Sequence, residues 1–143
     1  EHLFRKLQQE LWVLQGKTIA VLGLAFKPGT DDVRMSPSQY FIPELQKRGA
    51  ILRLWDPIAQ GKFDADHPGL DYFDSPMETV QGADAVLVLT DWPEVKDIKL
   101  DKLKEQCSIV IDGRNTFDLV EMEAHGFIYH SIGRTTVSKF QKP

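Results

Sequence analysis

The sequence predicts one doubly wound α/β domain, with a mainly parallel sheet of about six strands, helices on both faces and a further helix before the first strand. Short runs of aliphatic and β-branched residues alternate along the chain with stretches of helical periodicity. Links containing Gly, Pro, Asp and Ser separate them. With 143 residues, 42% of them hydrophobic, the chain is long enough for one domain to bury a core without disulfides.

The first expected element is an amphipathic helix over residues 1–15. Leu3, Phe4, Leu7 and Leu11 gather on one face of this helix, and charged or amide side chains lie outside that face. No capping residue precedes the first apolar residue, so the helix begins abruptly. We therefore expect it to be the end of a longer helix.

This interpretation divides the chain into three parts. Residues 1–16 are expected to be the C-terminal end of a central linking helix, and residues 17–134 to form the domain itself. Residues 135–143 are mostly polar and are expected to be a loose tail.

The remaining strands and helices alternate along the domain. Strands are expected where aliphatic and β-branched residues run together, at residues 18–22, 51–55, 71–74, 85–90, 108–111 and 127–130. Helices are expected where the apolar spacing becomes helical, at residues 37–47, 76–81, 99–106 and 118–125. Pro43 lies inside the first of these helices and predicts a kink or an early break. Residues 59–76 are the least periodic part, with a short edge strand near their end.

The stretch around which the chain is organised is KTIAVLGLAFKPGTDDVRMSP, residues 17–37. A buried strand passes into a long polar loop, and Ser36-Pro37 then begins a helix. In open parallel sheets, ligands bind beyond the carboxyl ends of the strands, where helix N-termini attract anions. Lys27 and Arg34 lie in this loop, so we expect a local cationic site for phosphate.

The second strand ends at Asp56. In a nucleotide-binding Rossmann-like unit, the acid at the tip of the second strand binds the ribose hydroxyls. Asp56 occupies that place in the chain. The G-x-G-x-x-G dinucleotide fingerprint is absent, because Gly23 and Gly29 do not have its spacing.

Three segments in order carry a family resemblance. The run GLAFKPGTDDVRMSP, then DGRN at residues 112–115 and IGR at residues 132–134, resembles the C-terminal domain of the UDP-glucose/GDP-mannose dehydrogenase family. The last two segments are most similar to the bacterial UDP-glucose 6-dehydrogenases. The resemblance implies the UDP-sugar-binding domain of a larger NAD-dependent oxidoreductase, which makes UDP-glucuronate from UDP-glucose in two steps for polysaccharide biosynthesis. It also implies that the catalytic cysteine and the NAD fingerprint lie outside this chain.

The resemblance implies ligand-binding roles for four side chains. Phe26, Lys27 and Arg114 match residues that bind the nucleotide sugar. Arg34 matches an arginine that reaches NAD, which is held mainly by the missing N-terminal domain, and a guanidinium fork suits phosphate. The alternative for Lys27 is a solvated loop lysine.

Other motif residues are expected to shape loops. Asp31 or Asp32 would pair with Arg34, and both are expected to hold the loop without acting as general bases. Gly113 would let the backbone approach a neighbour closely. A hydrogen-bonded turn, the alternative role for the DGRN segment, is assigned to its Asp and Asn, and Arg134 is left without a role beyond a helix C-terminus or domain contact.

Several other functions are disfavoured by composition. The net charge of −4 argues against nucleic-acid binding, and no apolar run is long enough to span a membrane. The four histidines lack the spacing of a metal site. The single cysteine, Cys107, reads as a small apolar residue between a helix and a strand, and one cysteine agrees with a reducing cytoplasm. Trp92 is the tryptophan placed to line a crevice.

The expected partners are UDP-glucose, the N-terminal domain of the same enzyme and, at full length, further copies of the chain. Three alternatives stay open at this point. The chain is a domain of a GDP-mannose or UDP-N-acetylhexosamine dehydrogenase, or a free-standing nucleotide-binding module without catalysis, or a fold kept only for subunit contact.

Overall fold

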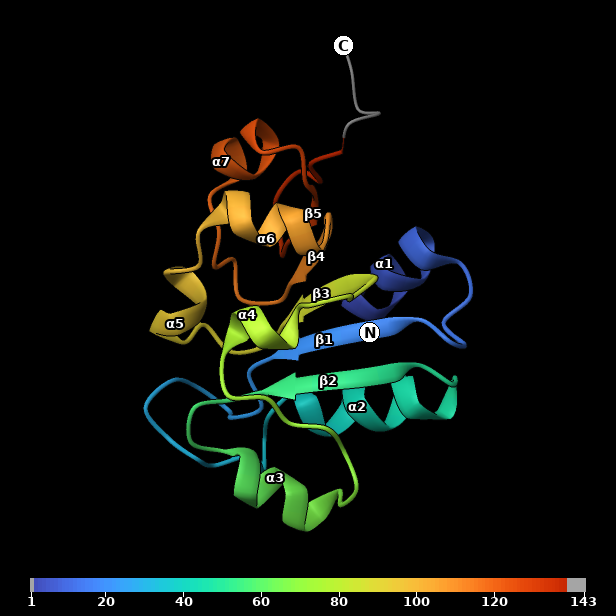
Figure 1. Cartoon of the computed structure of the whole chain (residues 1–143), viewed down its shortest axis with the longest axis vertical. Coiled ribbons are helices and arrows are strands. Elements are labelled where there is room, and N and C mark those ends of the chain that lie inside the picture. Colours follow the sequence, from blue (N-terminus) through green and yellow to red (C-terminus); the bar gives the residue numbers. More distant parts are fainter. Residues whose placement is uncertain (1, 139–143) are drawn as a thin grey trace.

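The computed structural model describes residues 2–138 and contains one parallel sheet (Figure 1). Its five strands are β1 Thr18–Leu22, β2 Ile51–Trp55, β3 Ala85–Val88, β4 Ile109–Asp112 and β5 Ile128–His130. They lie in the order β2-β1-β3-β4-β5, and every neighbouring pair is parallel. The predicted doubly wound α/β class is confirmed.

Helices cover both faces of this sheet. They are α1 His2–Leu11, α2 Ser38–Lys47, α3 Gln60–Asp66, α4 Pro76–Thr79, α5 Pro93–Lys96, α6 Leu100–Gln106 and α7 Leu119–Ala124. Figure 1 shows α1 and α2 behind the sheet and α4 and α6 in front of it. The ring centroids of Phe4 in α1 and Phe41 in α2 are 6.3 Å apart, which agrees with both helices packing on the same face of the sheet. No helix within residues 2–138 has the length and apolarity that a membrane span requires.

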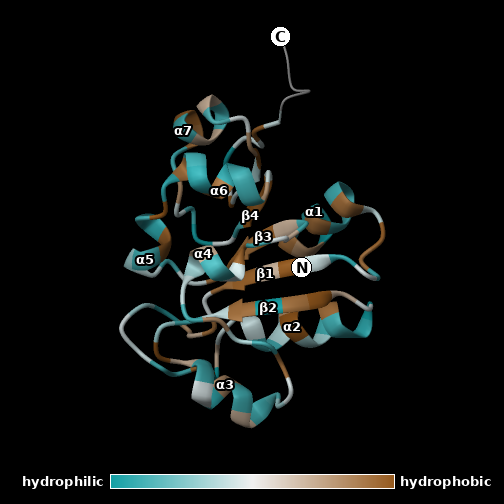
Figure 2. Ribbon diagram, in the orientation of Figure 1, coloured by the Kyte–Doolittle hydropathy of each residue, from teal (hydrophilic) through white to brown (hydrophobic). Residues whose placement is uncertain are grey.

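The core lies between the sheet and its helices. All four residues of β3 are buried, as are Ile19, Ala20, Val21 and Leu22 of β1. Central parallel strands need apolar residues on both faces, because helices cover both. Figure 2 shows this distribution, with hydrophobic strands inside and hydrophilic outer helix faces.

The expected edge strand at residues 71–74 is reduced to a single bridge. Tyr72 pairs with Leu54 of β2, through hydrogen bonds from Leu54 N to Asp71 O and from Phe73 N to Leu54 O. The exposed side chains of Asp71 and Asp74 flank this short pairing. The sheet therefore has five strands where about six were expected.

Three helical expectations are corrected. The irregular middle of the chain contains α3, whose single buried residue is Phe63, and the polar link after β3 contains α5. Pro43 does not break α2, which continues to Lys47 with Phe41, Ile42 and Leu45 buried. Burial of this apolar face outweighs the hydrogen bond that a proline cannot donate.

Both ends of the described chain pack on the domain. Helix α1 ends at Leu11, and Trp12 follows with a left-handed φ of 65° and a largely exposed side chain. Glu10 Oε2 lies 2.7 Å from Nε2 of the buried His130 in β5. Val137 forms an antiparallel bridge with Tyr129, so the expected loose tail is packed at least to this residue. The rest of that tail, residues 139–143, lies outside the described part.

Candidate functional site

The loops after β1, β3 and β4 meet at the carboxyl edge of the sheet. The strand order reverses beside β1, since β2 lies on one side of it and β3 on the other. Ligands in open α/β sheets bind at such a reversal, beyond the carboxyl ends of the strands. The cationic phosphate site expected from the sequence lies in the loop after β1, at this reversal.

A glycine allows the β1 and β3 ends to approach each other. Gly23 has a φ of 104°, and a Cβ added to it would lie 2.4 Å from Thr90 Cβ. Neither that backbone conformation nor that distance admits a side chain. The Thr90 hydroxyl donates to Ala25 O at 2.7 Å, so the two loops are also hydrogen-bonded.

Asp56 is corrected from a ribose-binding acid to a buried acceptor. Its side chain is 2% exposed, and its two oxygens accept five hydrogen bonds. Oδ2 accepts from Leu24 N, Ala25 N and Trp92 Nε1, while Oδ1 accepts from the amides of residues 58 and 59. A carboxylate so fully occupied has no oxygen left for a ribose. Trp92 is 6% exposed, so its ring is packed inside the domain.

The predicted sugar-binding pair lies at the exposed end of the first loop. Phe26 N donates to Asp32 O at 2.7 Å, which closes the loop, and the Phe26 ring is 43% exposed. Lys27 is exposed, and its ammonium makes no ion pair or hydrogen bond with any other described residue. This cation is therefore available to an anionic ligand.

Arg114 joins three loops through its guanidinium. Nε donates to Leu89 O at 2.9 Å, Nη2 donates to Phe26 O, and the backbone N donates to Asp112 Oδ1 at 2.9 Å. The side chain is half-buried, and two of its donor groups are committed to carbonyls of the β1 and β3 loops. Any contact between Arg114 and a ligand would use its remaining donors.

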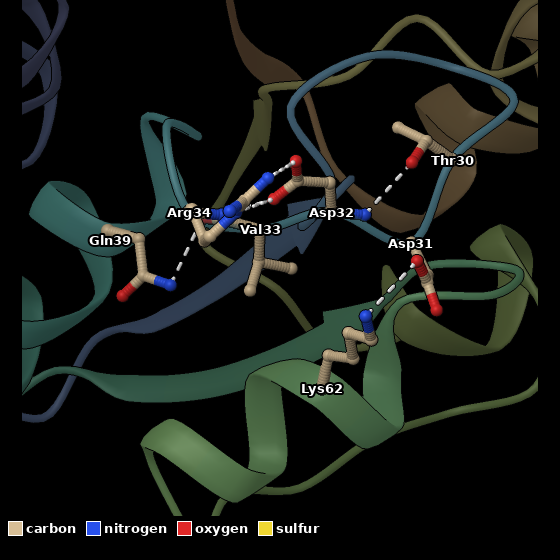
Figure 3. A network of polar contacts seen from close by, with 7 residues as sticks. All are labelled: Thr30, Asp31, Asp32, Val33, Arg34, Gln39 and Lys62. Carbon is tan, nitrogen blue, oxygen red and sulfur yellow. Dashed lines mark hydrogen bonds and ion pairs between the residues drawn. The ribbon is translucent and has the colours of Figure 1, made fainter.

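Arg34 is held by Asp32 in a two-point contact (Figure 3). Nε donates to Oδ1 at 3.0 Å and Nη2 to Oδ2 at 2.9 Å, and Arg34 N also donates to Oδ1 at 3.0 Å. Hydrogen bonds from the Arg34 side chain, then from its backbone, hold the pKa of the Asp32 carboxyl well below its ordinary range. The Arg34 side chain remains 85% exposed, so its orientation is fixed while its outer edge faces solvent.

Beside this pair lies an open depression of about 650 Å³ between the loop and α3. Lys62 of α3 reaches Asp31 across it at 3.6 Å, as Figure 3 shows. Two cations and three acidic residues line the depression: Arg34, Lys62, Asp31, Asp32 and Asp66. Asp32 pairs with Arg34 and Asp31 with Lys62, while Asp66 accepts from Gln39 Nε2, so this depression is not a free cationic pocket.

The DGRN and IGR segments bind each other through a buried network. The Tyr129 hydroxyl donates to Asp112 Oδ2 at 2.6 Å and accepts from Arg134 Nη2 at 2.7 Å. Burial, followed by the charge of Asp112, raises the pKa of the Tyr129 hydroxyl. Arg134 also donates to Phe117 O and to Ser131 Oγ. Arg134, which the sequence left without a role, thus ties the end of β5 to the loop after β4.

Asn115 and Gly113 complete this contact. Asn115 has a φ of 52°, and its amide group exchanges two hydrogen bonds with the backbone of Ile132, at 2.8 and 2.9 Å. A Cβ on Gly113 would lie 2.8 Å from Leu3 Cδ1 of α1 and 3.3 Å from Val88 O. The close approach expected at Gly113 is therefore made by helix α1 and the neighbouring strand.

Cys107 is buried, with 5% of its surface exposed. Desolvation raises the pKa of its thiol to about 11. The reactive species is the thiolate, so we expect no reaction with a disulfide reagent at about pH 8 until the protein is unfolded. Rapid modification of the folded chain would contradict this burial.

Sequence reasoning missed the connections that organise this edge. Asp56 and Trp92 are far apart in the chain, and so are Asp112, Tyr129 and Arg134, so spacing could not pair them. One signal was available, because Asp56 and Asp112 each end a buried strand. The described residues contain no group of His, Cys, Asp and Glu side chains able to hold a metal ion.

Comparisons with known proteins agree with this geometry. Residues 20–119 match the UDP-glucose/GDP-mannose dehydrogenase family, UDP binding domain. UDP-glucose 6-dehydrogenase TuaD of Bacillus subtilis is 46% identical over 139 residues, which are 95% of this chain and 30% of that protein. UDP-glucose 6-dehydrogenase of Pseudomonas aeruginosa is 38% identical, over 90% of this chain and 30% of the relative. The chain thus spans less than a third of the length of these relatives.

Solved structures show the same fold. A UDP-glucose dehydrogenase from Pyrobaculum islandicum superposes with a TM-score of 0.79 at 30% identity, covering 94% of this chain and 29% of that one. An NDP-N-acetyl-D-galactosaminuronic acid dehydrogenase from Methanosarcina mazei superposes with a TM-score of 0.80 at 30% identity, covering 93% and 29%.

Proposed function

The chain belongs to the UDP-glucose/GDP-mannose dehydrogenase family, and from this we propose that it is the nucleotide-sugar-binding domain of a UDP-glucose 6-dehydrogenase. The observation that carries the proposal is the exposed, unpaired ammonium of Lys27, on a loop closed at the carboxyl edge of β1. A cation at this edge would stabilise the negative charge of a bound diphosphate. The relatives named UDP-glucose 6-dehydrogenases favour UDP-glucose over the other nucleotide sugars considered.

In this proposal the residues of the chain bind and orient the substrate. Lys27 contacts the diphosphate, the exposed face of Phe26 packs against the nucleotide sugar, and Arg114 holds the loop that carries both. Orientation of a bound substrate lowers the entropic part of the barrier, and covering it excludes water from the reaction.

NAD would supply the hydride acceptor, and Arg34 is the residue of this chain that would contact it. Its guanidinium fits a phosphate group, because Asp32 fixes its orientation through Nε and Nη2 and no group within residues 2–138 accepts from Nη1. The catalytic thiol and most of the NAD site would lie in an N-terminal domain of the same polypeptide. We further propose that the full-length enzyme is a cytoplasmic homo-oligomer.

A titration and an assay test the proposal together. We expect UDP and UDP-glucose to bind this chain at one saturable site in calorimetry, with GDP-mannose binding more weakly. We also expect no UDP-glucose-dependent NADH formation by the chain alone, because Cys107 is buried and protonated. Absence of UDP binding would refute the binding role. NADH formation by this chain alone would refute the proposal that the catalytic groups lie in an N-terminal domain.

A further inference from the structure

We infer that Asp56 is a positioning residue, whose buried carboxylate sets the place of Phe26 and Lys27 at the nucleotide site. The inference rests on the proposed function in one respect, namely that these two residues bind UDP. The structural part concerns how the loop after β1 is held, and it can be tested without ligand.

The bonds to Asp56 lie directly before the proposed binding pair. Leu24 N and Ala25 N donate to Oδ2 at 2.8 and 2.9 Å, within a buried region. Leu24 and Ala25 are the two residues before Phe26, so a tilt of either peptide group would move Phe26 and Lys27. Hydrogen bonds to a charged acceptor are shorter and stronger than neutral ones, and they restrain such a tilt.

The carbonyl side of the same loop is held by other elements. Ser38 Oγ of α2 donates to Leu24 O at 2.9 Å, and Thr90 Oγ1 donates to Ala25 O at 2.7 Å. With Asp56, the loop is bonded to the end of β2, the start of α2 and the segment after β3. A loop fixed from three elements is preorganised before any ligand arrives.

Trp92 adds a bond from the β3 side to the same oxygen. Its Nε1 donates to Asp56 Oδ2 at 3.0 Å, so Oδ2 accepts three N–H groups. Oδ1 accepts two more, from Ile58 N and Ala59 N at the start of α3. All five partners are donors, which only a carboxylate can satisfy. An asparagine in either orientation would turn an NH₂ group toward at least two N–H groups.

The test compares Asp56→Asn with Met122→Ala in amide NMR spectra of the full 143-residue chain, followed by titration with UDP. Met122 is fully buried in α7 and contacts none of these loops through a hydrogen bond, so it controls for lost stability. In Asp56→Asn we expect shifted resonances for Leu24 to Lys27. We also expect about tenfold weaker UDP binding, because the displaced Lys27 ammonium would lose its contact with the diphosphate. Met122→Ala should lower thermal stability with neither change.

Each outcome decides the matter. Unchanged resonances of Phe26 and Lys27 in Asp56→Asn, or unchanged UDP affinity beside shifted resonances, would overturn the inference. If the unaltered chain does not bind UDP, the proposed function fails and the resonances alone decide the positioning role. If Asp56→Asn does not fold, Trp92→Phe takes its place, with the same shifts at Leu24 and Ala25 and about threefold weaker binding expected.

Discussion

Replacing Asp112 by alanine is expected to lower the free energy of unfolding by about 3–5 kcal/mol, the loss typical of breaking a buried charged network. Asp112 has no exposed surface and accepts five hydrogen bonds, from residues 114, 116, 117 and 129. The alanine would leave these buried and partly buried donors without their acceptor, among them the Tyr129 hydroxyl to which Arg134 also donates. In a domain of this size the melting temperature should fall by roughly 10 °C.

Asp118→Ala is the matched control for this loss. Asp118 is an exposed acid six residues further along, and its carboxylate caps α7 by accepting from Glu121 N at 3.1 Å. Removing a helix cap typically costs about 1 kcal/mol. Thermal and urea unfolding of both variants give the comparison. Similar losses for the two would mean that the Asp112 network contributes little more than a surface cap.

The sheet could be predicted because its signal is local. Aliphatic runs flanked by Gly or Asp occur at the three central strands β1, β3 and β4, where burial on both faces requires them. Helix α3 lacked a signal of this kind, since Phe63 is its single buried residue and one apolar residue gives no period. The prediction of an edge strand at residues 71–74 was wrong for a related reason, because a single bridge at Tyr72 requires no alternating pattern.

The candidate site was predictable in position but not in its connections. Strand ends and the cations after them placed Lys27, Arg34 and Arg114 at the carboxyl edge of the sheet, where the structure has them. The acid at the tip of β2 has the position of a ribose-binding residue, yet its oxygens are filled by donors from three segments. Such long-range bonds depend on tertiary packing, which spacing along one chain does not encode.

Lys27→Ala is expected to weaken UDP binding by about 10- to 100-fold, the value of one hydrogen bond to a charged group, and to leave thermal stability unchanged. The stability should not change because Lys27 is exposed and its ammonium makes no ion pair or hydrogen bond within residues 2–138. Lys47→Ala removes the same charge at the far end of α2, where the lysine pairs weakly with Glu44 at 3.3 Å. Equal UDP affinities of these two variants would remove Lys27 from the site.

Arg114→Lys should behave differently, because it changes both binding and stability. A lysine keeps the charge but cannot reproduce the fork that bonds Leu89 O and Phe26 O together. We expect the free energy of unfolding to fall by about 1–3 kcal/mol and UDP binding to weaken about tenfold, as the Lys27 loop loses one of its restraints. Calorimetric titration and thermal melts of the two variants separate the roles. Weaker binding without lost stability would make Arg114 a direct ligand contact, while lost stability with full affinity would make it a structural residue of the loops alone.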